Sequence, residues 1–453
     1  SGPETLFMRQ GRGRMRISRF DATQPGWIKV LSVYHGQSAL KFRQVDDGTV
    51  LAVDLNEPLG PEQELSLMME FESRLPRVFA RTGHAGDFFM VAQWYPKLAA
   101  LTREGSWKCR PYHPYEEYFG PFASYQVELT LPWNYKVAAT ATTQEIGRYG
   151  EDLARMSFRA DGVHDFAFSA WPAAVQTEAT LSGVRVLINS VPGRGAAPRL
   201  SRATEQGLDR LQRWFFPYPY KQLTLVDVPT RALGAAGMEY PALFTTWSPR
   251  WVPGWHHGVD ILVLHELTHQ YFQGMVASDE VEHPWLDEGV TTYVTGLMAD
   301  ELYGAQGSIM DLGPVRLGHH HLRRILAMRS GKHPRAVGSP ARSFPSASAY
   351  SRAVYSRAAL MLATVEDLVG RGAMLQALGA YARRFAFGHP GTSDLTEALV
   401  RAAPAALRET VRRLVMGVVH GAPGQVLDYG VTCGEDVVHV LSSGDLRVPV
   451  ELS

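Results

Sequence analysis

The sequence predicts a multidomain α+β protein, in which a β-sandwich-like N-terminal region precedes a mainly helical region. At 453 residues the chain is long enough for two or three domains. Apolar residues alternate in its first part, whereas its later part shows helical spacing. A stretch rich in Pro, Gly and small residues at 189–198 separates the two patterns. We therefore expect domains at 1–191 and 192–423, followed by a short β segment at 424–453.

The N-terminal region carries several segments with the alternation of a half-buried strand. In the clearest one, Tyr125, Val127, Leu129 and Leu131 alternate with polar residues. Turn residues separate these segments at fairly regular intervals, which is typical of a β-sandwich. Further strands are expected at 28–33, 49–55, 64–71 and 136–140.

Beyond the boundary the period of the apolar residues changes. A helix is expected to start near residues 258–260, with Asp260 suited to its N-cap or first turn. Ser393 or Asp394 is expected to cap a later helix that runs to Leu399. Other helices are expected at 204–215, at 355–381 and through most of 287–418, with strands at 221–228, 238–244, 438–441 and 446–450.

Composition and charge exclude several classes of protein. Forty-five basic residues balance forty-five acidic ones, so neither nucleic-acid binding nor attraction to a membrane surface is indicated. No apolar run approaches the roughly 20 residues of a membrane helix. Cys109 and Cys433 are expected to be free thiols in different domains. The chain opens without an initiator Met and looks trimmed, so we expect no indication of compartment, and the sequence indicates no oligomeric state.

Residues 265–269 have the pattern H-E-x-x-H. On a helix, His265 and His269 lie one turn apart on the same face, where both imidazoles can bind one Zn²⁺. Glu266 lies beside the first histidine and can act on a metal-activated water without being a ligand. A catalytic zinc needs a third protein ligand, for which Glu288 is the candidate. By itself, Glu288 is equally typical of a first-turn acid that the helix dipole favours.

Two other histidine groups, at 256–257 and 319–321, are expected to serve packing or solvation rather than a second metal. The sequence contains no G-x-S-x-G elbow of a serine hydrolase and no Walker-type phosphate loop. The H-E-x-x-H segment is therefore the main feature of the sequence that indicates a catalytic function.

Eighteen residues separate His269 from Glu288, and this H-E-x-x-H-x18-E spacing resembles the M1 family of zinc aminopeptidases, which are gluzincins. The resemblance is to a bacterial-type member trimmed at both ends, and it implies a thermolysin-like, mainly helical zinc catalytic domain. Other segments agree with family motifs in the same order. They are W-Y-P-K at 94–97, G-M-E-Y-P at 237–241 (resembling G-x-M-E-N), W-L-D-E-G at 285–289, Y-S-R at 355–357 (resembling Y-x-K-G) and F-G-H-P at 387–390.

The resemblance implies one Zn²⁺ per chain, held by His265, His269 and Glu288, and peptide substrates with a free N-terminus. It implies hydrolysis of the N-terminal peptide bond by zinc-activated water, with Glu266 as the general base. Tyr355 is implied to donate a hydrogen bond to the oxyanion that forms on the carbonyl.

The G-M-E-Y-P segment is implied to bind the substrate through Gly237, Met238 and Glu239, with the Glu239 carboxylate on the free α-amine. As a bare residue, Glu239 is more typical of a solvated strand acid. Tyr355 alone is likewise more typical of a tyrosine in a packed core.

Three positions depart from the family motifs. Tyr240 stands where Asn is usual, Arg357 stands where Lys is usual, and Ala358 stands where Gly is usual. A zinc endopeptidase therefore stays open as an alternative. A non-catalytic M1-like binding module is a second alternative, although the complete set of zinc ligands together with Glu266 favours an enzyme.

Overall fold

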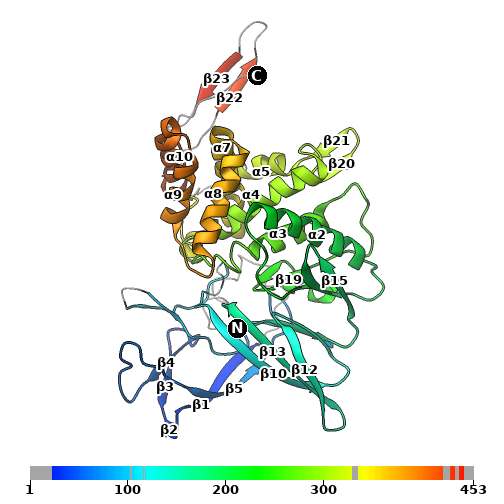
Figure 1. Cartoon of the computed structure of the whole chain (residues 1–453), viewed down its shortest axis with the longest axis vertical. Coiled ribbons are helices and arrows are strands. Elements are labelled where there is room, and N and C mark those ends of the chain that lie inside the picture. Colours follow the sequence, from blue (N-terminus) through cyan, green and yellow to red (C-terminus); the bar gives the residue numbers. More distant parts are fainter. Residues whose placement is uncertain are drawn as a thin grey trace. The chain divides into compact units, whose positions relative to one another are not determined.

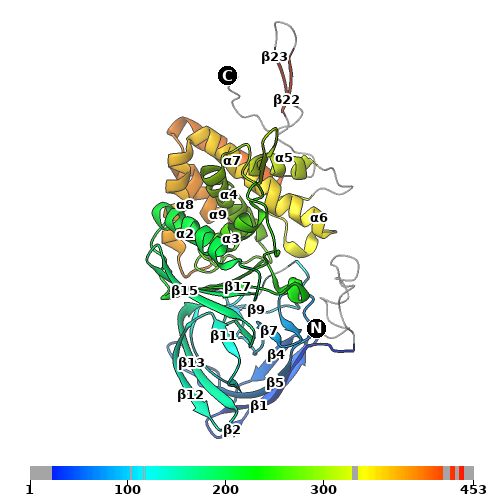
Figure 2. The ribbon, with the colours of Figure 1, turned by 90° about the vertical axis from the view of Figure 1, so that its right-hand side faces the viewer.

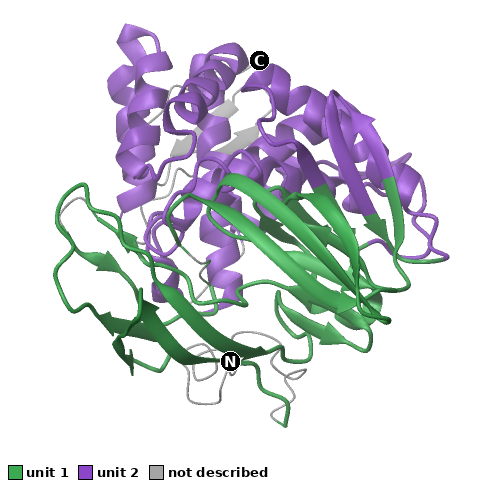
Figure 3. Ribbon diagram, turned by 60° about the horizontal axis from the view of Figure 1, so that its bottom comes forward, with its two compact units in different colours: residues 1–177, 189–192, 224–247 green, residues 178–188, 193–223, 248–453 purple. Residues whose placement is uncertain are grey.

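The computed structural model describes residues 23–102, 105–115, 117, 119–328, 335–421, 429–433 and 438–442. The chain divides into two compact units (Figure 3). Unit 1 comprises residues 1–177, 189–192 and 224–247, and unit 2 comprises residues 178–188, 193–223 and 248–453. Because each unit takes its residues from separate parts of the sequence, the boundaries expected at 191 and 423 stay predictions.

Unit 1 is rich in antiparallel β-structure, as the alternating pattern predicts (Figure 2). One sheet has the order β10 (Ala123–Pro132), β13 (Leu153–Val163), β12 (Thr142–Tyr149). A second has the order β11 (Lys136–Ala139), β14 (Phe168–Trp171), β7 (Phe88–Val91), β6 (Gly83–Ala85). The remaining strands are β2 (Ser38–Ala39), β1 (Trp27–His35) and β5 (Met68–Arg74) in one sheet, and the pairs β3 (Lys41–Val45) with β4 (Val50–Asp54) and β8 (Ala100–Leu101) with β9 (Trp107–Lys108).

The strands predicted from alternation are confirmed in position, although some ends differ. β5 begins at Met68 rather than at residue 64. Along β13, alternate residues such as Met156 and Phe158 are buried, as expected for a strand with one face on a core. Phe158 packs edge-on against Phe166, with ring centroids 6.1 Å apart.

A five-stranded sheet has the order β15 (Val175–Leu181), β16 (Val184–Ser190), β17 (Gln222–Asp227), β19 (Leu243–Thr246), β18 (Met238–Tyr240). β17 pairs in parallel with β19, and β18 pairs antiparallel with β19. The single strand predicted over 238–244 is wrong, because the chain turns between β18 and β19. Ala242 makes this turn in the left-handed region, at φ 55°.

Unit 2 is mainly helical, as predicted for most of 287–418 (Figure 1). No helix of the described residues combines the length and apolar character that crossing a membrane requires. The predicted strand at 446–450 lies outside the described residues. The helices are α2 (Ala197–Trp214), α3 (Gly258–His269), α4 (Pro284–Tyr303), α5 (His319–Met328), α6 (Ala347–Tyr350), the π-helix η4 (Ser351–Arg357), α7 (Ala358–Val369), α8 (Arg371–Phe385), α9 (Thr392–Ala402) and α10 (Arg408–His420).

Three short 3₁₀ helices and two hairpins complete the described elements: η2 (Thr230–Ala235), η3 (Ala341–Ser343), η5 (Ala405–Leu407), β20 (Met310–Leu312) with β21 (Val315–Leu317), and β22 (Tyr429–Cys433) with β23 (Val438–Ser442). α2 begins seven residues before the predicted start at 204, with a Pro in its first turn. The run predicted over 355–381 is divided at Gly370, whose φ of 87° ends α7. α9 is capped by Gly391, whose amide donates to Asp394 Oδ2 at 2.8 Å.

Two glycines allow close helix packing in unit 2. α2 packs against α3, where a Cβ built on Gly207 would lie 2.6 Å from Leu267 Cδ2. α4 packs against η4 and α7, where a Cβ on Gly289 would lie 2.5 Å from Ala358 Cβ and 3.0 Å from the Val354 carbonyl oxygen. Gly289 therefore sets how closely α4 approaches the segment that carries Tyr355.

We expect Gly289→Ala to lower the free energy of unfolding by about 1–3 kcal/mol, because the added methyl overpacks the contact of α4 with η4 and α7. Gly372→Ala on α8 is the matched control, since a Cβ there meets no atom within 4 Å. Denaturant unfolding of both variants measures the difference. Equal stabilities for the two variants would contradict this account of the packing.

Candidate metal centre

The H-E-x-x-H segment forms the last turns of α3, as the sequence predicts. Val263, Leu264 and Leu267 bury the helix in unit 2. At its start, Arg199 from α2 pairs with both carboxylate oxygens of Asp260, at 2.7 and 2.8 Å. Asp260 thus acts as the first-turn acid, while His257 occupies the N-cap position. Packing and charge together fix the helix that carries the histidines.

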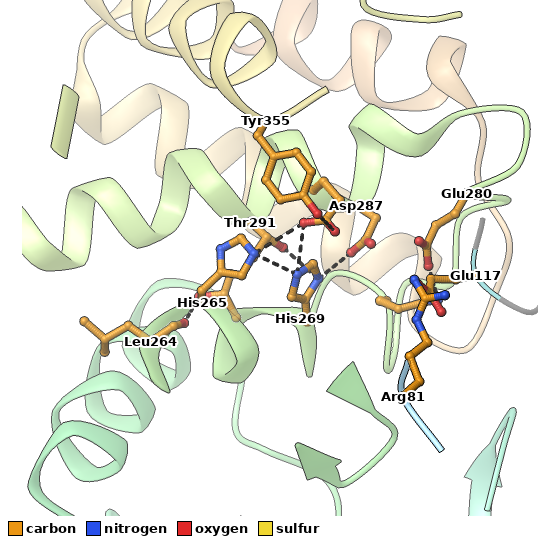
Figure 4. Close-up of polar contacts among 12 residues, drawn as sticks. Arg81, Glu117, Leu264, His265, His269, Glu280, Asp287, Thr291 and Tyr355 are labelled. Atoms are coloured by element: carbon orange, nitrogen blue, oxygen red, sulfur yellow. Dashed lines mark hydrogen bonds and ion pairs between the residues drawn. The ribbon is translucent and has the colours of Figure 1, made fainter. Parts of the chain in front are cut away.

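The side chains of His265, His269 and Glu288 come together in unit 2 (Figure 4). The two histidine Nε2 atoms lie 3.2 Å apart, and each lies 3.3 Å from Glu288 Oε2. Ligands at about 2.0–2.1 Å from a tetrahedral zinc stand about 3.3 Å from one another. The nearly equilateral triangle of two imidazole nitrogens and one carboxylate oxygen therefore fits Zn²⁺.

The electrostatics of this triangle favour metal-binding protonation states. Burial lowers the pKa of His265 to about 4, although the Glu288 carboxylate opposes the shift. Burial alone would raise the pKa of Glu288, but the charge of His269 and hydrogen bonds from both histidines outweigh it and lower that pKa. A neutral imidazole and an ionised carboxylate near neutral pH are the forms that coordinate a metal.

Asp287 contacts His269 at Nδ1, the ring nitrogen that is not the candidate ligand atom. The sequence did not predict this contact. Its Oδ1 lies 2.6 Å from His269 Nδ1, and both residues are 1% exposed. Thr291 Oγ1 lies 3.3 Å from the same nitrogen. A proton on Nδ1 shared with Asp287 leaves Nε2 free as a ligand. The only signal in the sequence was the place of Asp287 directly before Glu288.

Tyr355 points toward His265 and His269 in Figure 4. Its hydroxyl donates a hydrogen bond to Glu288 Oε1. Its ring stacks on His265 with centroids 6.1 Å apart and an interplanar angle of 19°. Glu266 follows His265 on α3 and is 3% exposed. The structure thus groups Tyr355 with the three candidate ligands and places buried Glu266 next to one of them in the chain.

Tyr355 belongs to the π-helix η4, which the sequence did not predict. Such wider turns are rare and often occur at functional sites. Arg357, the cation of the Y-S-R segment, donates to the Arg335 carbonyl oxygen at 3.2 Å. Burial lowers the pKa of Arg357. The Arg357 guanidinium therefore contacts the backbone of residue 335.

The F-G-H-P segment holds the chain between α3 and α4. The Ala277 amide donates to the Gly388 carbonyl oxygen at 3.0 Å, and His389 Nδ1 lies 2.7 Å from the Ala277 carbonyl oxygen. At the start of α4, Trp285 Nε1 donates to Thr392 Oγ1 at 3.1 Å. These contacts fix the first turn of α4, which carries Asp287 and Glu288.

The G-M-E-Y-P segment lies in unit 1. Gly237 has φ 68°, a conformation that favours glycine, and its amide donates to the Thr245 carbonyl oxygen at 3.1 Å. Met238 and Glu239 are buried in β18. The Tyr240 hydroxyl donates to the Arg81 carbonyl oxygen at 3.3 Å, and burial raises its pKa well above the usual value. Tyr240, which departs from the family motif, thus has a packing partner in unit 1.

The W-Y-P-K segment has a structural role in unit 1. Asp165 accepts hydrogen bonds from Gln93 Nε2 at 2.7 Å and from the Tyr95 hydroxyl at 3.1 Å. Lys97 Nζ pairs with the same carboxylate at 2.8 Å. Burial lowers the pKa of Lys97, and the Asp165 charge opposes that shift. A single buried carboxylate thus holds this segment.

The other histidines make packing contacts, and Cys109 lies at the surface. In the described part of the chain, the side-chain groups that could hold a metal contain neither His256–His257 nor the histidines at 319–321. His257 stacks on Tyr303 with centroids 3.9 Å apart. Cys109 is an exposed free thiol. The side chain of Cys433 lies outside the described residues.

A buried two-histidine, one-carboxylate centre on an H-E-x-x-H helix defines the class of zinc metallohydrolases. Comparison with known proteins gives a family to which part of the chain is similar. Residues 203–416 match the peptidase family M1 domain.

Named relatives agree with this family. The leukotriene A-4 hydrolase homolog of Botryotinia fuckeliana is 32% identical over 124 residues, which cover 27% of this chain and 19% of that protein. Aminopeptidase M1-A of Oryza sativa subsp. japonica is 26% identical over 234 residues, covering 49% of this chain and 25% of the relative. The chain thus matches a quarter or less of the length of these relatives.

A solved structure agrees in fold. The M1 zinc metallopeptidase of Deinococcus radiodurans superposes with a TM-score of 0.61 at 19% sequence identity, and the match covers 86% of this chain and 84% of that one. The predicted fold class, a strand-rich N-terminal region followed by a helical catalytic domain, is therefore confirmed.

We expect Asp287→Asn to weaken zinc binding about 10- to 100-fold, because the substitution removes the charge that orients His269. Titration with a competing chelator measures zinc affinity. Asp209→Asn, an exposed change on α2, is the control and should bind zinc like the wild type. Wild-type affinity in Asp287→Asn would show that the His269 contact does not support the centre.

Proposed function

We propose that this chain is a zinc-dependent aminopeptidase, which hydrolyses the N-terminal peptide bond of peptides with a free N-terminus. The observation that carries the proposal is the triangle of His265, His269 and Glu288 at 3.2–3.3 Å, with Glu266 next to His265 on the same helix. The match to the peptidase family M1 domain supports the reaction class, as do relatives named aminopeptidases.

His265, His269 and Glu288 would hold one Zn²⁺, which supplies a Lewis acid for the scissile carbonyl and lowers the pKa of water. Glu266 accepts the proton of the attacking water and passes it to the leaving amine. Its burial, at 3% exposure, keeps competing bulk water away from that carboxylate. Asp287 holds His269 in the tautomer that this chemistry needs.

Tyr355 stabilises the oxyanion that forms when the carbonyl carbon is attacked. Without substrate its hydroxyl donates to Glu288 Oε1, so it already lies beside a candidate ligand. Redirecting this donor to the carbonyl oxygen adds a hydrogen bond that strengthens as negative charge develops, an effect often worth about 3–4 kcal/mol.

Glu239 binds the α-ammonium group of the substrate, with Gly237 and Met238 shaping the strand that presents it. The support is the match of residues 237–239 to the family's exopeptidase motif and the buried position of Glu239 in β18. A mutant of the Deinococcus radiodurans enzyme has a bound Tyr-Ser-Ala substrate, and a mutant two-domain M1 zinc metallopeptidase has bound L-tryptophan. Short peptides with a free N-terminus are therefore the first substrates to test.

The endopeptidase alternative rests on Tyr240, which stands at the motif position where Asn is usual. It differs from the proposal in one measurable property, since an endopeptidase does not require a free amine. The non-catalytic alternative predicts no turnover at all. The two experiments that follow separate these three possibilities.

We expect Glu266→Gln to lower kcat/KM for aminoacyl-p-nitroanilides by about 10²- to 10⁴-fold, because the general base is lost. Zinc content should stay at one ion per chain, since Glu266 is not a ligand. Elemental analysis and initial rates measure the two quantities. Absence of zinc from the wild type, or equal rates for the variant, would exclude the proposed mechanism.

We expect a peptide with a free N-terminus to be cleaved and its N-acetylated form to resist cleavage, because acetylation removes the charge that Glu239 binds. Glu239→Ala should raise KM for the free peptide at least tenfold, since a charge-assisted contact is worth about 1.5–3 kcal/mol. Glu145→Ala on the exposed strand β12 is the control. Equal cleavage of both peptides would favour the endopeptidase.

A further inference from the structure

Helix α5 is tied to the helix that carries Glu288, although no motif marked it. Its first residue, His319, is 1% exposed. The His319 amide donates to Ser308 Oγ at 2.8 Å, and that hydroxyl donates to Asp300 Oδ1 at 2.6 Å. Because Asp300 belongs to α4, two hydrogen bonds in series fix the start of α5 on α4.

A glycine lets the two helices approach closely. A Cβ built on Gly296 of α4 would lie only 2.7 Å from His319 Nδ1. One turn after His319, Arg323 lies on the same face of α5, with Nη2 at 3.4 Å from His319 Nε2. Burial lowers the pKa of His319 well below its usual value, so its neutral ring can accept from the guanidinium.

Arg323 is a partly buried cation on α5, a helix that packs against η4 and α4, the elements that carry Tyr355 and Glu288. Among the described residues, its Nε atom is enclosed and has no hydrogen-bond partner. Burial lowers the pKa of Arg323, and interaction with Tyr355 and Glu288 opposes that shift. Arg323 in turn contributes to lowering the pKa of His265.

The partial burial of this charge makes its position informative. A cation that is partly removed from water is unfavourable unless nearby groups compensate it. Its Nε atom has no hydrogen-bond partner among the described residues, and the contact of Nη2 with a neutral histidine offers little compensation. Glu288 and Tyr355 are the groups that oppose the effect of burial, so a further negative charge that forms beside Tyr355 would also be stabilised.

We propose that Arg323 is a positioning residue of the peptidase reaction, whose fixed positive charge beside Tyr355 and Glu288 stabilises the negative charge that develops on the scissile carbonyl. This inference rests on the proposed function. In this proposal Arg323 acts through space and through Tyr355, and its enclosed Nε keeps the side chain in place. A charge held in place before the reaction needs no reorganisation during it.

The same charge has an opposite effect on metal binding. A cation near Glu288 repels Zn²⁺, so its removal leaves zinc affinity unchanged or makes it stronger. If Arg323 served only to pack α5, its removal would loosen α4 and weaken zinc binding. Zinc affinity therefore distinguishes an electrostatic role from a merely structural one.

The test compares Arg323→Met, Arg323→Lys and the matched control Arg324→Met, which changes an exposed arginine on the same helix. We expect Arg323→Met to lower kcat by about 10- to 100-fold, somewhat less than the loss of a direct oxyanion donor. KM should change less than about threefold, because the charge acts mainly in the transition state. Arg323→Lys should restore most of kcat, and Arg324→Met should behave as wild type.

Two binding measurements complete the test. Chelator competition should show wild-type or tighter zinc binding in Arg323→Met. A phosphinic peptide, an anionic analogue of the tetrahedral intermediate, should lose affinity for Arg323→Met in parallel with kcat/KM. Binding of an uncharged peptide amide analogue should stay the same.

Wild-type kcat in Arg323→Met would overturn the inference, as would equal impairment of Arg323→Lys and Arg323→Met. Weakened zinc binding in Arg323→Met would assign Arg323 a structural role and also overturn it. A wild-type protein that binds zinc but cleaves no peptide would overturn the proposed function together with this inference. Activity in the wild type with no effect of Arg323→Met would contradict this inference alone.

Discussion

The contact between His269 and Asp287 is the interaction on which the centre depends. It joins the end of α3 to the first turn of α4 across 2.6 Å, so one hydrogen bond sets both the tautomer of a ligand and the separation of two helices. Glu288 follows Asp287 directly, and any shift of that contact would move the third ligand. The close packing at Gly289 then brings η4 against the same turn and places Tyr355 on Glu288. The ligand triangle is thus a product of helix packing.

Charge is the second constraint. Glu266, Asp287 and Glu288 are all at most 9% exposed, and burying carboxylates without compensation is costly. Zn²⁺ held by the candidate ligands would offset this cost, which would link metal binding to folding stability in unit 2. In our proposal, Arg323 offsets part of the cost in the protein alone. Such a centre would balance buried negative charge with one permanent cation and one exchangeable one.

Local features of the sequence predicted which side chains come together at the candidate centre. The histidine spacing and apolar stripe placed His265 and His269 on a helix, and both properties depend only on residues within a few turns. Other features depend on residues far apart in the sequence. The π-turn at Tyr355 and the left-handed turn at Ala242 have no local signal, since nothing in the residue type of Ala favours φ 55°. The role of Asp287 could not be predicted from the sequence, because it depends on the first turn of α4 lying next to His269 at the end of α3.

The proposed role of Arg323 shows why a motif alone does not identify every cation near a site. The Y-S-R segment suggests Arg357 as the relevant cation. In the structure, the Arg357 guanidinium donates a hydrogen bond to a backbone carbonyl oxygen at 3.2 Å. The guanidinium whose charge acts on Glu288 comes from α5, and that helix reaches α4 only because Gly296 leaves room for His319. Gly296 can be seen in the sequence, but its role in helix packing is clear only when the residue that packs against it, His319, is known. The positions of the charges around such a centre therefore depend on packing between helices, which a local sequence motif does not predict.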